Sequence, residues 1–329
     1  MTARCETSGS NARASHPFAA TPARTMAPRY AQRMTDDSVQ GTGAHRFSGP
    51  NDLHLHSNHS DGTESPAEVV RQAHGHGIRT LALTDHDRST GWNEAAQASA
   101  SLGMTFLPGM ELSAKYEWRS VHVLGYLFDP DDSALRAETD RIRDDRIGRA
   151  ERIVRNIGRD YDLVWDDVLA QTVGDATVGR PHIADALVAR GIVRDRSAAF
   201  DGILHPREGY YEPHYAPDPL SAVNLITGAG GVAVIAHPVT TGRDRMMPIP
   251  FIERLVDAGL GGFEIDHREN TEQGKKILRE LAAKHDLIVT GSSDYHGAGK
   301  PNLPGENTTS DAMVARIIER ATGSEPRYA

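Results

Sequence analysis

The feature that most limits the fold of this chain is a series of short apolar runs that alternate with segments of helical spacing. The runs lie at residues 51–56, 78–87, 105–112, 120–128, 230–238, 260–267 and 287–296. Apolar runs of this length, separated by helical segments, are typical of parallel strands that are covered on both faces. The sequence therefore predicts an α/β fold.

The segments between these runs carry helix signals. Ser65 and Pro66 can cap and open a helix that ends near residue 76, because a proline in the first turn loses no hydrogen bond. Further helices are expected at residues 89–102, 249–258 and 271–285. Strand and helix thus alternate along most of the chain, as they do in α/β barrels.

Residues 129–219 interrupt this alternation, because they contain no convincing strand. Helices are expected there at residues 133–159, 165–171, 180–190 and 194–203. The segment is too long for an ordinary connection between two elements. We therefore predict a catalytic barrel made of residues 46–128 and 220–329, with residues 129–219 inserted as a small helical cap subdomain over the active face.

Composition limits the classes of partner. The net charge of −9 argues against a broad surface for nucleic acid or anionic membrane, so we expect no stable nucleic-acid complex. No window approaches the roughly 18 uninterrupted apolar residues of a membrane span. The single cysteine, Cys5, can form no intrachain disulfide, which suits a reducing cytoplasm. Residues 1–45, rich in Ser, Thr, Ala and Arg, are predicted to be a disordered tail, and the oligomeric state stays open.

Ionisable side chains occur where the apolar runs stop. They are His54 and His56, Asp85 and His86, Glu111, His237, Asp266 and His267, and Asp294 and His296. The carboxyl ends of parallel barrel strands face one side, where active sites lie, so these residues can converge in one pocket. A hydrophobic core gives no reason to bury charge at each strand end. The pattern therefore predicts a metal site.

Imidazole and carboxylate ligands without a thiolate suit Mn, Fe or Zn. The candidates outnumber the ligands of a single catalytic ion, which normally takes about three from the protein. Two to three divalent ions are therefore expected as cofactors. Ions clustered in this way promote hydrolysis, because they activate a bridging water and polarise the bond that breaks.

Six short motifs contain most of these residues. In chain order they read DLHLHSNHSDG, LALTDHD, LPGMEL, HVLGY, AHP and SSDYHG. Together they resemble the motifs of the polymerase and histidinol phosphatase (PHP) family of metal-dependent phosphoesterases, over about residues 51–309. The resemblance implies a distorted (β/α)7 barrel of seven parallel strands, with its metals at the carboxyl ends of the strands.

All nine positions of the family's ligand set hold a residue able to bind metal. The resemblance implies three groups: His54, His56 and Asp294 for one ion, Glu111 as a bridge to a second ion held also by His122 and His237, and Asp61, His86 and His296 for a third. Asp85 looks like a residue that orients its neighbours. His59 has no place in the set and is expected to face solvent or to support the ligands.

The insertion, GRPHIADALV at residues 179–188 and LPGENTT at residues 303–309 look like the stand-alone small-molecule phosphatases of the family. Members of that branch act on nucleoside monophosphates, 3',5'-bisphosphorylated nucleosides, short RNA ends or cyclic sugar phosphates. The resemblance implies a phosphoesterase that hydrolyses phosphate esters of small nucleotide-like metabolites, by attack of a hydroxide that bridges the metals.

Three alternatives stay open. The same ions would serve a 5'-3' exonuclease on short RNA, although the absence of a basic tract favours a small metabolite. A histidinol phosphatase is a second alternative, although the insertion and residues 303–309 favour the nucleotide branch. A metal-stabilised regulatory module should have lost ligands, and none of the nine is lost.

Substrate-holding residues follow from position and charge. Arg180 opens a helix, so its guanidinium and the nearby N–H groups can hold a phosphate together. His267 directly follows a strand end and can protonate the leaving oxygen or bind a second phosphate. The weaker substrate-binding candidates are His214, His182 and Arg268. Residues 209–217 and 264–270, which are rich in His and Tyr, are expected to shape substrate choice.

Overall fold

The computed structural model describes residues 49–172, 174, 176–240 and 246–329. The tail predicted at residues 1–45 lies outside the described residues. In the described part of the chain, no helix has both the length and the apolar character needed to cross a membrane.

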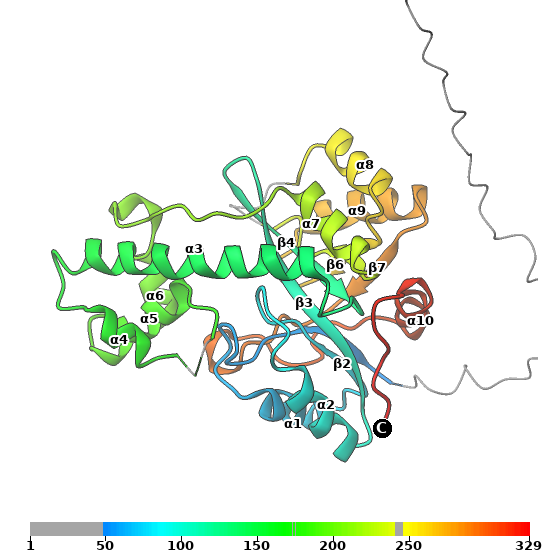
Figure 1. The fold of residues 1–329 in the computed structure, drawn as a ribbon, viewed down its shortest axis with the longest axis horizontal. Helices are drawn as coiled ribbons and strands as arrows, with labels where there is room; N and C mark the ends of the chain where they lie inside the picture. The colour runs from blue at the N-terminus through cyan, green and yellow to red at the C-terminus, as the bar shows by residue number, and fades with distance from the viewer. Residues whose placement is uncertain (1–48, 173, 175, 241–245) are drawn as a thin grey trace, which may run out of the picture. The chain divides into compact units, whose positions relative to one another are not determined.

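Within the described residues, seven strands form one sheet in chain order (Figure 1). They are β1 (Asn51–Leu55), β2 (Thr80–Leu83), β3 (Thr105–Tyr116), β4 (Arg119–Tyr126), β5 (Val232–Ile235), β6 (Gly262–Asp266) and β7 (Ile288–Gly291). The His56 N–H donates to the Tyr295 carbonyl oxygen at 2.9 Å, which joins the end of β1 to the segment after β7. The sheet thus curves into a nearly closed barrel, and the predicted fold class is confirmed.

The prediction of seven parallel strands was wrong for β4, which runs antiparallel to both β3 and β5. Glu117 and Trp118 alone separate β3 from β4, so the connection is a hairpin, since a parallel pair needs a crossover of about a dozen residues. His122 lies in the amino-terminal half of β4. Because β4 is reversed, this half lies at the end of the barrel that the carboxyl ends of the parallel strands share.

Four helices follow the strands as predicted: α1 (Pro66–Gly75), α2 (Trp92–Ser101), α8 (Ile249–Asp257) and α9 (Glu272–Lys284). The Ser65 hydroxyl accepts the Glu68 N–H at 3.3 Å at the start of α1, as the capping residues indicate. The sequence analysis did not predict α7 (Pro219–Gly228) or α10 (Asp311–Arg320), which also pack against the sheet. Two 3-10 turns, η1 (Pro206–Glu208) and η2 (Gly297–Gly299), complete the elements.

The strands supply apolar side chains to both faces of the sheet. Leu81, Phe106 and Val123 belong to the core that packs under the helices. Ala82 and Leu124, each one position along its strand, belong to a second core on the opposite face. Burial of each large apolar side chain contributes about 1.5–3 kcal/mol, so the strands are firmly held and their ends are fixed in space.

The insertion is helical, with α3 (Ser133–Ile157), α4 (Trp165–Leu169), α5 (Arg180–Ala189) and α6 (Arg196–Asp201). None of the described residues between 129 and 219 belongs to a strand. Figure 1 shows α4, α5 and α6 gathered beside the long α3. They share a separate apolar cluster that includes Ile153, Ile183 and Leu187. The division of the chain into barrel and cap domains stays a prediction.

Candidate metal centre

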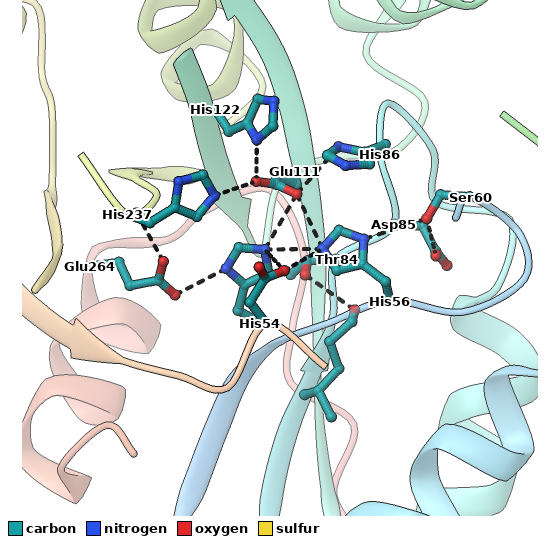
Figure 2. A network of polar contacts seen from close by, with 12 residues as sticks. His54, His56, Ser60, Thr84, Asp85, His86, Glu111, His122, His237 and Glu264 are labelled. Carbon is teal, nitrogen blue, oxygen red and sulfur yellow. Dashed lines mark hydrogen bonds and ion pairs between the residues drawn. The ribbon is translucent and has the colours of Figure 1, made fainter. Parts of the chain in front are cut away.

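Glu111 lies at the centre of the site, in the middle of β3 (Figure 2). Its side chain is almost completely buried. One carboxylate oxygen, Oε2, lies 3.3 Å from His54 Nε2, 3.1 Å from His56 Nε2 and 3.2 Å from His86 Nδ1. The ends of β1 and β2 therefore bring three imidazoles to one oxygen.

The other oxygen of Glu111, Oε1, faces a second set of imidazoles. It lies 2.7 Å from His122 Nδ1 and 3.3 Å from His237 Nε2. His122 comes from the reversed strand β4, and His237 follows the end of β5. One carboxylate thus separates two groups of nitrogen donors, which is the geometry of a bridging ligand.

Asp294, after β7, lies against the first of these groups. Its Oδ1 is 3.4 Å from both His54 Nε2 and His56 Nε2. Its Oδ2 is 2.6 Å from Lys300 Nζ and 3.6 Å from His267 Nε2. The backbone of Asp294 has a φ of 54°, a left-handed conformation that is rare for residues with a side chain. Backbone strain of this kind clusters at functional sites, where the surrounding structure enforces it.

Asp61, in the loop after β1, forms a third group with two histidines. Its Oδ1 lies 3.2 Å from His296 Nε2, and its Oδ2 lies 3.7 Å from His86 Nε2. The rings of His56 and His296 stack with their centres 4.1 Å apart. His56 and His86 therefore each lie between this third group and the group around Glu111.

The buried carboxylates and imidazoles set one another's protonation. Burial alone would raise the pKa of Glu111, but neighbouring histidines, His122 first, hold it well below its usual range. Burial likewise opposes ionisation of Asp294, and Lys300 foremost keeps its pKa well below the usual range. Burial lowers the pKa of His56, yet the carboxylates of Asp294 and Glu111 outweigh this and raise it to about 9. The metal-free site therefore holds charged carboxylates beside protonated imidazole.

The donor atoms of this site fit divalent cations. Within this site, four buried ring nitrogens have no aligned hydrogen-bond partner among the described residues, although a carboxylate oxygen lies within 3.6 Å of each. They are Nδ1 of His86 and His122 and Nε2 of His267 and His296. Buried polar atoms without partners are rare and call for an explanation such as a bound ion. In each of three sets of residues, the donor atoms lie within 4.8 Å of one another. The sets are His56, Asp61, His86 and His296; His54, His56 and Glu111; and His86, Glu111 and His122. Imidazole with carboxylate suits borderline or hard divalent ions.

Comparisons with known proteins agree with this site. Residues 52–161 match the model of the PHP domain. The chain is 34% identical to a 3',5'-nucleoside bisphosphate phosphatase of Chromobacterium violaceum, over 82% of this chain and 95% of that protein. It is 32% identical to a 5'-3' exoribonuclease of Haemophilus influenzae, over 74% of this chain and 89% of that protein. A crystal structure described as a metal-dependent phosphoesterase of Bifidobacterium adolescentis matches with a TM-score of 0.81 and 40% identity, over 84% of this chain and 98% of that chain.

The chain belongs to the PHP family. It is a hydrolase of phosphoester bonds with a metal-dependent phosphoesterase fold, and its cluster of His, Asp and Glu is able to hold metal ions. The resemblance seen in six sequence motifs is confirmed. The assignment of single residues to single ions stays a prediction.

The PHP site contains one carboxylate that the sequence analysis did not single out. Glu264 in β6 is fully buried, and its Oε1 lies 3.0 Å from His54 Nδ1. Its Oε2 accepts the His237 N–H at 2.9 Å (Figure 2). A carboxylate behind a histidine fixes the ring's orientation and tautomer, which makes the other nitrogen a better ligand. The sequence did contain a signal for Glu264, because a carboxylate is unusual inside an apolar run, here between Phe263 and Ile265.

Asp85 makes contacts of the kind that its predicted orienting role requires. It accepts the Ser57 N–H at 2.8 Å, the Ser57 hydroxyl at 2.7 Å and the Ser60 hydroxyl at 2.7 Å. These bonds hold the loop that carries Asp61 and that follows His56. The role itself stays a prediction.

Two predicted residues lie against other protein groups at the edge of the site. The Nδ1 of His59 lies 2.7 Å from the Thr90 hydroxyl, and His59 belongs to none of the three donor sets. Arg268 donates to Asn302 Oδ1 at 2.9 Å. These contacts are structural, and a role of Arg268 in substrate binding stays a prediction.

The remaining candidates lie on or beside α5 of the insertion. His182 is buried, and its Nδ1 accepts the Gly179 N–H at 3.1 Å, which closes the first turn of the helix. The Arg180 guanidinium carbon lies 5.6 Å from the centre of the Tyr211 ring. His214 lies on the same irregular segment as Tyr211. The structure thus brings Arg180 near the segment of His214 and gives His182 a capping contact.

Glu264→Gln should lower metal affinity about 10- to 100-fold, because an amide cannot hold His54 and His237 as the carboxylate does. Titration of the metal-free protein with Zn or Mn would measure the change. Glu253→Gln is the matched control, since Glu253 pairs with Lys284 on the surface. Wild-type affinity in Glu264→Gln would show that this carboxylate does not support the ligands.

Metal uptake should release protons at pH 7. The metal-free His56 ring, with a pKa raised to about 9, is protonated at that pH and must lose its proton to bind a cation. Affinity should therefore rise with pH up to about 9 and then level off. Calorimetric titration in two buffers of different ionisation enthalpy counts the protons. Affinity that does not change between pH 7 and pH 9 would contradict the expected protonation.

Proposed function

We propose that this PHP enzyme hydrolyses phosphate esters of small nucleotide-like metabolites, with two to three divalent ions of Mn, Fe or Zn. The observation that carries the proposal is the position of Glu111, whose two oxygens face separate sets of imidazoles. In enzymes that cleave phosphate esters, neighbouring ions bridged in this way stabilise both the attacking and the leaving oxygen.

We assign the ligands as the motifs imply. One ion takes His54, His56 and Asp294; the second takes His122 and His237, with Glu111 between the two; and the third takes Asp61, His86 and His296. Contacts of Glu111, Asp294 and Asp61 with these rings support the grouping. His86 faces two of these groups, because its Nδ1 also lies 3.2 Å from Glu111 Oε2.

The chain's own residues supply positioning and a proton. Ions in such a centre, when bound, neutralise the phosphoryl oxygens and activate water. Glu264 holds His54 and His237 in place, and Asp85 holds the loop of Asp61. His267 Nδ1 accepts the Glu269 N–H at 3.2 Å, so the proton of the neutral ring lies on Nε2. This Nε2 faces the site beside Asp294, and we propose that its N–H donates a hydrogen bond to the leaving oxygen. It transfers the proton itself only from the doubly protonated ring, because loss of the proton from the neutral ring would leave an imidazolate.

The relatives favour a small phosphorylated substrate. One acts on 3',5'-nucleoside bisphosphates, and the chain covers 95% of its length. The second candidate function, trimming of short RNA from the 5' end, has support from the similar exoribonuclease. The net charge of −9 favours the small substrate, because an RNA-binding surface is usually rich in Lys and Arg. All nine donor positions hold a residue able to bind metal, which speaks against a regulatory module, and a histidinol phosphatase stays an alternative.

Location and partners are also proposals. A cytoplasmic location rests on the single cysteine, Cys5. Among the four residues predicted to bind substrate, His182 and Arg268 already bind other protein groups. We propose Arg180 and His214 as the residues that contact the substrate, because Arg180 opens α5 and is among the cations that surround the His214 ring.

The purified chain should carry two to three ions and should release phosphate fastest from a nucleotide. Substrates to compare are AMP, adenosine 3',5'-bisphosphate, a cyclic ribose phosphate, histidinol phosphate and short 5'-phosphorylated RNA. Asp61→Ala should lose one ion selectively and slow turnover at least about 100-fold, while His59→Ala should keep all ions. Metal content below one ion per chain with no turnover would defeat the proposed function. Equal loss of all ions in Asp61→Ala would defeat the grouping.

A further inference from the structure

Positive charge gathers around residues 209–217, the stretch GYYEPHYAP, which contains no helix or strand. We refer to Lys115, Arg146, Arg149 and Arg180 as the cation cluster. Lys115 comes from β3, Arg146 and Arg149 from α3, and Arg180 from the first turn of α5. The cluster thus joins the barrel to the insertion, in a chain whose net charge is −9.

Two of these arginines face one aromatic ring. The guanidinium carbons of Arg149 and Arg180 lie 5.1 Å and 5.6 Å from the centre of the Tyr211 ring. Arg149 Nε also donates to the Glu212 carbonyl oxygen at 2.6 Å. The Tyr211 ring thus holds the two guanidinium groups near each other.

Arg146 lies at the start of α5 and beside the metal centre. Gly179 is the residue directly before α5, and a Cβ atom at this position would lie 3.6 Å from Arg146 Nη1. The charge of Arg146 therefore lies at the positive end of the helix dipole. Arg146 also donates to the Ser113 hydroxyl and lies 3.2 Å from Asp87 Oδ2. Asp87 directly follows the proposed ligand His86. The cation cluster therefore adjoins the metal centre.

The register of β3 gives the distance between the metal centre and the cation cluster. Side chains alternate along a strand, so Glu111, Ser113 and Lys115 lie on one face of β3. Ser113 is also paired with His122 on the neighbouring strand. A step of two residues spans about 7 Å, so the cation cluster begins about that far from Glu111 and continues away from it.

Arg146 has an acidic partner in Asp87, whereas two other members of the cluster have none among the described residues. Among the described residues, Lys115 and Arg149 form no ion pair, and Arg149 is only 6% exposed. Burial, followed by Arg146, Arg149, Lys115 and Arg180, lowers the pKa of His214 to about 2, so this ring stays neutral. The buried Nδ1 of His214 has no hydrogen-bond partner among the described residues. Buried positive charge without a counter-charge is costly, and a bound anion would offset the cost.

We propose that the cation cluster and His214 bind a second phosphate of the substrate, about one sugar ring away from the phosphate that is hydrolysed. The substrate class is then a small bisphosphorylated metabolite rather than a monophosphate. This inference rests on the proposed function, because it assigns the first phosphate to the metal centre. Arginine and lysine bind phosphate through charge-assisted hydrogen bonds, which are about twice as strong as neutral ones.

The local extent of the cluster favours a small molecule over RNA. The exposed positions along α3 mix both signs, so they form no continuous positive track for a longer phosphate backbone. They include Asp140, Asp144 and Glu151 beside Arg136, Arg141 and Arg155. A nucleic-acid surface needs a continuous track of positive charge. The cluster instead provides charge for one group next to the metal centre.

Binding of phosphorothioate analogues, which resist hydrolysis, to the metal-loaded protein tests the second site without turnover. Calorimetry should compare the analogue of adenosine 3',5'-bisphosphate with those of the adenosine 3'- and 5'-monophosphates and of a 5'-phosphorylated trinucleotide. The wild type should prefer the bisphosphate to either monophosphate by about 10- to 100-fold, as expected for one or two hydrogen bonds to charged groups. Lys115→Met and Arg180→Met, both at half-buried positions, should each reduce this preference about tenfold. Arg155→Met, an exposed site on α3, is the matched control and should retain it.

The outcomes separate this inference from the proposed function. Equal affinity for bisphosphate and monophosphate, or a preference that survives in both Lys115→Met and Arg180→Met while their melting temperatures match the wild type, would overturn the second site. A larger loss for the trinucleotide than for the bisphosphate would assign the cluster to RNA and would also overturn it. If the wild type prefers the bisphosphate but the metal-loaded enzyme releases phosphate from no substrate, the second site stands and the proposed function fails.

Discussion

The buried carboxylate of Glu111 is the interaction on which the rest of the centre depends. Its two oxygens lie within 3.3 Å of ring nitrogens from five histidines. Removing one ion from water costs several kcal/mol unless opposite charge compensates it. In the metal-free chain protonated imidazoles provide that charge, and the raised pKa of His56 is one consequence. Cations held by this cluster of His, Asp and Glu would take over that role, and the cluster is able to hold them because charged residues follow so many strands of an otherwise apolar barrel.

The barrel and the insertion contribute different groups to the site. The strands carry the donor atoms, and apolar packing on both faces holds the strand ends in register. The insertion brings Arg146, Arg149 and Arg180 to the same end and ties itself to the third donor group. Thr177 donates to the His86 carbonyl oxygen at 3.0 Å, and Arg196 donates to the Asp61 carbonyl oxygen at 3.0 Å. Hydrogen bonds thus link the insertion, which carries most of the cation cluster, to the backbone of two donor residues, His86 and Asp61.

Much of this centre could be predicted from the sequence, because the strand ends are recognisable. His54 and His56, for example, stand two residues apart in a short apolar run, so both point to one face of the barrel. The reversal of β4 could not be read in this way. Its hairpin contains no glycine or asparagine, and Glu117 itself adopts the left-handed φ of 56° that a tight turn requires. The family resemblance therefore led to the wrong direction for this one strand, although His122 does lie beside Glu111, with its Nδ1 2.7 Å from Oε1.

Contacts between residues far apart in the sequence could not be predicted either. Glu264 lies 210 positions from the histidine that it holds, and the cation cluster joins residues from β3, α3 and α5. No local spacing connects Lys115 to Arg180, so only the folded chain shows that their charges meet around residues 209–217. Arg180 and His214 were predicted singly from local signals, and the structure explains why they belong together.

The central claim is that Glu111 separates two cations. Crystals of the protein grown with Mn would test it most directly, by anomalous diffraction. The account predicts one peak on each side of the Glu111 carboxylate, one near His54 and one near His122, and loss of both peaks in Glu111→Ala crystals that keep the fold. A single peak away from Glu111, or two peaks that remain in Glu111→Ala, would contradict the account.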